Sequence, residues 1–116
     1  MNMQMIHSLF ALFSGLEDTL SYAPLVMTAV QEVSAGLRAG ADAGDVRLCY
    51  LAAAVTNLRF VQMNAAKEKM LATYAGTVTK QSDHTPQIRA AEQLLGTYRA
   101  LCSDLLEETS FFFMSV

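Results

Sequence analysis

The sequence is poor in charge. Charged side chains make up 16% of its 116 residues, whereas an average soluble protein has about 25%. The eight lysines and arginines are scattered singly, apart from Lys67 and Lys69, and they form no basic stripe. Because phosphate binding requires several cations on one face, we expect no nucleic-acid partner and no polybasic contact with a membrane surface.

The residues that usually carry chemistry are also few. The two histidines, His7 and His84, are isolated, and no Cys-x-x-Cys or Glu-x-x-His pair occurs, so the common zinc and di-iron helix signatures are missing. The glycine-rich segment 36–44 lacks the preceding strand and the following lysine that a phosphate-binding loop needs. We therefore predict no catalytic residues, no metal and no cofactor, and we expect that the protein is not an enzyme.

Long apolar runs and a secretory start are absent as well. A membrane-spanning helix needs about 18 or more consecutive apolar residues, and no segment provides them. The N-terminus lacks the cationic start of a signal peptide. Cys49 and Cys102 each lie in an apolar helical pattern, where a thiol behaves as a small hydrophobe. These features predict a cytoplasmic protein with reduced cysteines and no membrane partner.

Helical periodicity runs through most of the chain. Hydrophobic residues make up 53% of the sequence, and they recur at the three- and four-residue steps of amphipathic helices. A chain of this length can build one core without metal or disulfide support. We predict an all-α fold, a four-helix bundle-like single domain with helices over about 3–20, 24–37, 45–75 and 86–108 and an extended C-terminal tail over 109–116.

Several residues mark the predicted helix ends. Asp45 and Thr85 are suited to accept a hydrogen bond from a free backbone N–H at a helix start. Pro24 and Pro86 suit a first helical turn, where the missing N–H leaves no bond unmade. Gly76 provides a stop for the third helix.

The third predicted helix is the centre of the bundle. No charged residue occurs between Arg47 and Arg59. A helix with apolar side chains on all sides is typically covered by neighbours over most of its circumference. We therefore expect the other three helices to pack around this segment.

The tail and the N-terminus are the predicted interaction segments. Three consecutive phenylalanines cannot all face one core, so at least one is expected to be exposed or to enter another surface. Burial of the rings against the same chain is the favoured interpretation, and docking into a neighbouring subunit is the competing one. The N-terminal methionines are adaptable side chains for which contact with a partner and ordinary packing are equally expected. The candidate contact residues are Phe111, Phe112, Phe113, Met114, Met3 and Met5.

A second function of a different class is also compatible with the sequence. A helical bundle can carry or sense an apolar small molecule between its helices. The residues predicted to line such a site are Tyr50, Phe60, Met63 and Tyr98. A cavity of about 300 Å³ or more inside one protomer would favour this interpretation.

One stretch resembles a known family. It reads Asp45-Val46-Arg47-Leu48-Cys49-Tyr50-Leu51-Ala52-Ala53-Ala54, and it is similar to the Asp-led, Leu- and Ala-rich helix of small helical phage head-tail connector proteins. The resemblance implies a helical, oligomeric structural protein that is made in the cytoplasm and built into a ring of the phage particle. The excess of apolar residues without catalytic groups favours a non-catalytic structural or protein-interaction module that self-associates or docks a partner protein. A phage or prophage origin is what the resemblance implies.

Overall fold

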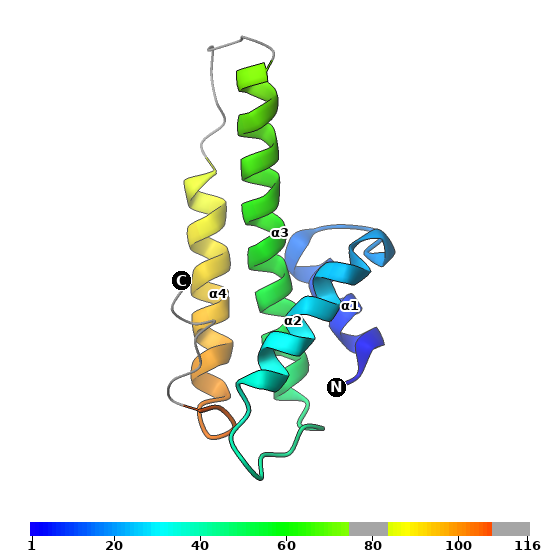
Figure 1. The fold of residues 1–116 in the computed structure, drawn as a ribbon, viewed down its shortest axis with the longest axis vertical. Coiled ribbons are helices and arrows are strands. Elements are labelled where there is room, and N and C mark those ends of the chain that lie inside the picture. The colour runs from blue at the N-terminus through cyan, green and yellow to red at the C-terminus, as the bar shows by residue number, and fades with distance from the viewer. Residues whose placement is uncertain (75–83, 108–116) are drawn as a thin grey trace.

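The computed structural model describes residues 1–74 and 84–107, with the side chains of 69–74 left out of the description. Within these residues the regular elements are all helical, so the predicted all-α bundle is confirmed (Figure 1). None of the described helices is long and apolar enough to cross a membrane. The elements are α1 (Met3–Ser14), the 3₁₀ turn η1 (Leu20–Tyr22), α2 (Ala23–Ala35), α3 (Arg47–Tyr74) and α4 (Thr85–Leu101).

Helix α3 is the central element of the bundle. Its 28 residues span about 42 Å at 1.5 Å per residue, and α1, α2 and α4 each pack against it. In Figure 1, α4 runs antiparallel along one side of α3, while α1 and α2 lie across the half of α3 that contains its N-terminus. Residues 51–55 are at most 1% exposed, so neighbours cover every side of this part of α3, as the sequence predicted.

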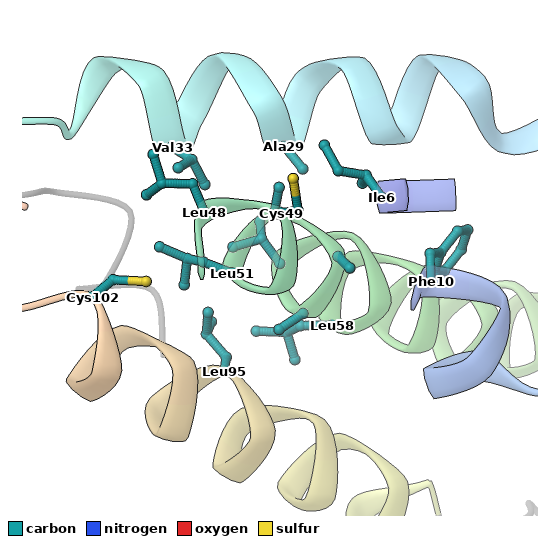
Figure 2. Close-up of a cluster of buried hydrophobic side chains, with 14 of the residues drawn as sticks. Ile6, Phe10, Ala29, Val33, Leu48, Cys49, Leu51, Leu58, Leu95 and Cys102 are labelled. Atoms are coloured by element: carbon teal, nitrogen blue, oxygen red, sulfur yellow. The ribbon is translucent and has the colours of Figure 1, made fainter. Parts of the chain in front are cut away.

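The core lies where the three other helices meet α3. Figure 2 shows Ala29 and Val33 of α2 directed toward α3 from one side and Leu95 of α4 from the other. Each fully buried aliphatic or aromatic side chain contributes about 1.5–3 kcal/mol relative to an exposed one. The largest fully buried side chains are Phe10, Ile6, Leu48, Leu51, Leu58, Val26, Val33, Val55, Thr56 and Cys102.

The first helix is shorter than predicted. The apolar period continues through Leu20, but α1 ends at Ser14 because Gly15 adopts a left-handed conformation with φ of 79°. The Gly15 N–H donates to the carbonyl oxygen of Ala11 at 2.9 Å and closes the helix. The chain then turns, and a 2.8 Å hydrogen bond joins the His7 and Thr19 side chains. The predicted continuous helix over 3–20 is therefore wrong beyond residue 14.

The starts of the second and third helices were predicted well. Pro24 lies in the first turn of α2. The Arg47 N–H donates to Asp45 Oδ1 at 2.9 Å, so Asp45 caps α3 as predicted. Helix α2 ends at Ala35, two residues before its predicted end. Gly76 lies outside the described residues.

The fourth helix starts one residue early and ends well before its predicted limit. Thr85 is its first residue rather than its cap, and the preceding residue, His84, makes no capping bond with its side chain. After Leu101 the chain turns back, and Leu106 forms an antiparallel bridge with Leu37. Leu105 and Leu106 are buried by this return toward the end of α2. The helical periodicity beyond residue 101 therefore reflects burial in a turn, and the prediction of helix to 108 is wrong.

Candidate interaction surfaces

A cluster around Arg47 joins the start of α3 to the turn that follows α4. The Arg47 guanidinium donates hydrogen bonds to the Asp45 carboxylate at 2.9 and 3.1 Å, to the Asp104 carboxylate at 2.9 and 3.1 Å, and to the Leu101 carbonyl oxygen at 2.8 Å. These five bonds match the five N–H donors of an arginine. We call Asp45, Arg47 and Asp104 the Arg47 clasp.

The clasp changes the acidity of its members. Hydrogen bonds from Arg47 lower the pKa of Asp45 and of Asp104 below the ordinary value of 3.8. The same bonds, first those with Asp45 and then those with Asp104, raise the pKa of Arg47. Both carboxylates are thus held ionised by a partner that stays charged, which makes the clasp a structural tie rather than an acid–base pair.

A second tie fixes the end of the described chain. The Arg38 N–H donates to the Leu105 carbonyl oxygen at 2.8 Å, and the Glu107 N–H donates to the Gly36 carbonyl oxygen at 2.9 Å. The Arg38 guanidinium adds a 3.0 Å bond to the Leu106 carbonyl oxygen. Residues 36–38 and 105–107 therefore form a short two-stranded bridge, which we call the terminal bridge. Glu107 is therefore held in a defined position beside the end of α2.

The predicted contact residues fall in two places. Met3 and Met5 of α1 are partly buried and pack against the hydrophobic core. Phe111, Phe112, Phe113 and Met114 lie outside the described residues.

The four residues predicted to line an apolar pocket do not lie together in one cluster. Tyr50 and Tyr98 are together, with ring centroids 5.3 Å apart. Phe60 contacts Phe10 of α1 and Tyr22 of η1, with ring centroids 5.6 and 5.1 Å apart, and Met63 is 45% exposed.

One buried polar residue was missed by the sequence analysis. Asn57 is 5% exposed, and its Oδ1 atom is buried without a hydrogen-bond partner. It lies seven residues after Tyr50, which places both on one side of α3. The sequence feature that could have identified Asn57 is its amide side chain in the middle of the uncharged stretch of the central helix.

Titratable groups in the described part of the chain do not gather into a reactive site. No group of three or more His, Cys, Asp or Glu side chains is placed there to hold a metal ion. His84 Nε2 pairs with Glu68 Oε2 at 2.6 Å, and Cys49 and Cys102 are both buried and free. Burial raises the pKa of the Cys102 thiol, which disfavours the reactive thiolate.

The first 37 residues, which form α1, η1 and α2, have very few charges. The first 37 residues contain Glu17, Asp18 and Glu32 and no lysine or arginine. In the same segment Leu12 is 75%, Leu20 74% and Met27 52% exposed. The helical period does not predict these exposed residues, because it identifies the inward-facing side of a helix. The absence of lysine and arginine before Arg38 is visible in the sequence and indicates the low surface charge.

Comparison with known proteins adds no family to these observations. No family model, no curated protein and no solved structure matches the chain. The functional proposal therefore rests on the surfaces described above.

Proposed function

We propose that this protein is a non-catalytic structural module that assembles with further copies of itself. The observation that carries the proposal is the exposure of large apolar side chains in a domain with little surface charge. Full burial of one such side chain is worth about 1.5–3 kcal/mol, so covering several in an interface favours association. Within residues 1–74 and 84–107 the exposed large apolar side chains are Leu12, Leu20, Met27, Val46, Met63 and Leu101, each at least 45% exposed.

The predicted tail contacts fit this proposal. Residues 105–107 are held in the terminal bridge, so the Phe-rich segment follows a fixed point of the fold. Val46 and Leu101, both more than half exposed, lie close to the Arg47 clasp at the same end of the bundle, since Arg47 bonds the Leu101 carbonyl oxygen. We propose that the phenylalanine rings enter a neighbouring copy. The resemblance to head-tail connector proteins supplies the proposed setting, a ring of phage or prophage origin.

The test is the solution mass of the intact chain and of a version ending at Ser110, measured by light scattering over a wide concentration range. We expect the intact chain to form a defined oligomer. We expect the truncated chain to show a smaller mass at equal concentration, because up to three phenylalanine side chains are lost from the contact. Circular dichroism should show that the helical content is retained.

A full-length variant with alanine at positions 111, 112 and 113 is the matched control, because it removes the rings and keeps the chain length. Equal masses for this variant and the intact chain would remove the tail from the proposal. An intact chain that stays monomeric at about 1 mM, well above the concentrations at which specific complexes form, would contradict self-association itself.

A further inference from the structure

The solvent-facing side of α4 carries a groove near the start of the helix. The groove has a volume of about 440 Å³ and is open to solvent, and this size falls within the roughly 300–1,000 Å³ of typical ligand sites. Ala91 and Leu95, on the opposite side of α4, are buried. We call this feature the α4 groove; its lining residues, all exposed, are Thr85, Pro86, Arg89, Ala90 and Gln93.

The α4 groove combines apolar surface with one cation. The Pro86 ring, the Ala90 methyl group and the aliphatic stem of Arg89 provide the apolar part. The Arg89 guanidinium makes no ion pair and no hydrogen bond with any residue that the structure describes. An arginine that is not engaged in this way attracts the face of an aromatic ring. The groove therefore suits a segment that brings aromatic rings and no positive charge.

The last nine residues of the sequence have this chemistry. Residues 108–116 contain three phenylalanines, one glutamate and no lysine or arginine. The negative charge of Glu108 is complementary to Arg89 and to the positive end of the α4 dipole. A covered aromatic side chain buries about 150–250 Å², so three rings supply up to roughly 450–750 Å², which approaches the roughly 800 Å² per partner of a standard interface.

The position of the groove indicates that the rings come from another copy. Residues 105–107 are held at the Leu101 end of α4, where they meet residues 36–38, whereas the α4 groove lies toward the other end of that helix (Figure 1). Arg89, in the middle of the groove, is twelve residues from Leu101, a distance of about 18 Å along the helix. The four residues from Glu107 to Phe111 span at most about 14 Å. The three rings therefore cannot fill the groove of their own chain together.

We infer that residues 111–113 of one copy dock in the α4 groove of a second copy, with one ring stacked on the Arg89 guanidinium. This inference names the acceptor for the tail contact proposed above and rests on that proposal. The contact joins two different surfaces, the tail of one copy and α4 of the next. A contact of this kind repeats from copy to copy and closes into a ring when the rotation between copies permits it, which fits the proposed setting.

The first experiment replaces Ala90, a lining residue, by glutamate. The new side chain occupies part of the groove, and its carboxylate competes for Arg89, so A90E should raise the dissociation constant of self-association at least tenfold in sedimentation equilibrium. Glutamate is a good helix former, and circular dichroism would verify that the variant is folded. The matched control is A66E, the same change at an exposed alanine of α3, which should leave the constant within twofold of the parent.

The second experiment tests the guanidinium. Arg89→Gln should raise the dissociation constant about threefold to tenfold, the range expected for the loss of a partly exposed cation–π contact. The matched control is Lys67→Gln, which removes the same charge from an exposed lysine of α3 and should change the constant less than twofold. Equal effects of the two substitutions would mean a general dependence on net charge and would overturn the contact with Arg89.

The third experiment uses the separation of tail and groove. The variant with alanine at positions 111, 112 and 113 keeps the groove and lacks the rings, whereas A90E keeps the rings and has an altered groove. Each variant alone should be monomeric at about 100 μM, within the range of weak to moderate complexes. An equimolar mixture should form a complex of twice the monomer mass, because the tail of A90E can enter the intact groove of the alanine variant.

These outcomes separate the inference from the proposed function. If the alanine variant loses association while A90E and A66E behave alike, or if the mixture stays monomeric, the α4 groove is not the acceptor and self-association through the tail stands. A parent chain that stays monomeric at about 1 mM would overturn both. A complex that forms only in the mixture supports docking between copies, because a tail bound to its own α4 cannot produce it.

Discussion

At the scale of single residues, two glycines have different backbone conformations. Gly15 has a φ of 79° at the end of α1, whereas Gly96 lies within α4 with helical neighbours. A Cβ atom at either position would meet no heavy atom within 4 Å. Differences between alanine variants at these positions should therefore arise from the backbone and not from crowding.

We expect Gly96→Ala to raise the free energy of unfolding by about 0.5–1 kcal/mol, because glycine in a helix interior loses more conformational freedom on folding than alanine does. Gly15→Ala should lower it by about 1–2 kcal/mol, because an L side chain is strained in the left-handed region. Urea unfolding of both variants beside the parent chain measures the two changes. Shifts of the same sign would contradict the assigned backbone conformations.

At the scale of elements, the Arg47 clasp makes stability depend on pH. The pKa values of Asp45 and Asp104 lie below 3.8 in the fold, so the contribution of the clasp is present above the pKa of the unfolded chain and is lost as the pH falls through the lowered values. We expect the urea midpoint of the parent chain to fall between about pH 5 and pH 2. Asp104→Asn should reduce that fall, because one of the two shifted carboxylates no longer titrates.

A double-variant series isolates the clasp from the other carboxylates. In an Arg47→Met background the two aspartates have lost the partner that lowers their pKa values, so adding Asp104→Asn should change the pH dependence little further. If Asp104→Asn keeps the full acid sensitivity of the parent chain, or if its effect is unchanged without Arg47, the clasp does not control stability in acid.

The helices also show which features of a fold a sequence can predict. The central position of α3 follows from the charge-free stretch between Arg47 and Arg59, because burial on all sides selects apolar residues at every helical angle. The ends of α1 and α4 were misplaced because an apolar period continues through any segment that is buried, whether it is helical or turned. Leu105 and Leu106 are buried in a turn, and Gly15 ends the helix although Leu16 continues the apolar period.

The candidate surfaces were predictable to a smaller extent. Composition indicated exposed apolar residues, but their positions depend on how the helices pack. Leu20, for example, continues the apolar period of the first predicted helix and is nevertheless 74% exposed. The proposed tail contacts stay a prediction, since residues 111–114 lie outside the described chain. The Arg47 clasp joins residues 57 positions apart, a pairing that no local pattern contains.

At the scale of the whole molecule, protection from solvent should decrease along α3. Residues 51–58 are all buried, whereas residues 63 and 66–68 are exposed, and Figure 1 shows α1 and α2 covering only the half of α3 nearer its N-terminus. Amides in segments with few buried contacts exchange through local opening, at a lower free energy than core amides. We expect amides of residues 64–68 to exchange at least tenfold faster than those of residues 51–58.

Hydrogen exchange measured by mass spectrometry tests this gradient. Peptides from the two segments can be compared within one experiment, which removes differences in conditions. Equal exchange rates along α3 would contradict the expectation that the part of α3 not covered by α1 and α2 opens more easily.

The terminal bridge has a consequence for the order in which the chain folds. Arg38 and Leu106 are 68 positions apart in the sequence, so forming the bridge closes a long loop, and the entropy of that closure is lost before the contact provides any stabilisation. We therefore expect the helices and their packing on α3 to bring the two segments together first, and the bridge to form as a late step. Weakening it should accelerate unfolding and leave the folding rate nearly unchanged, because interactions absent from the transition state act on the unfolding rate.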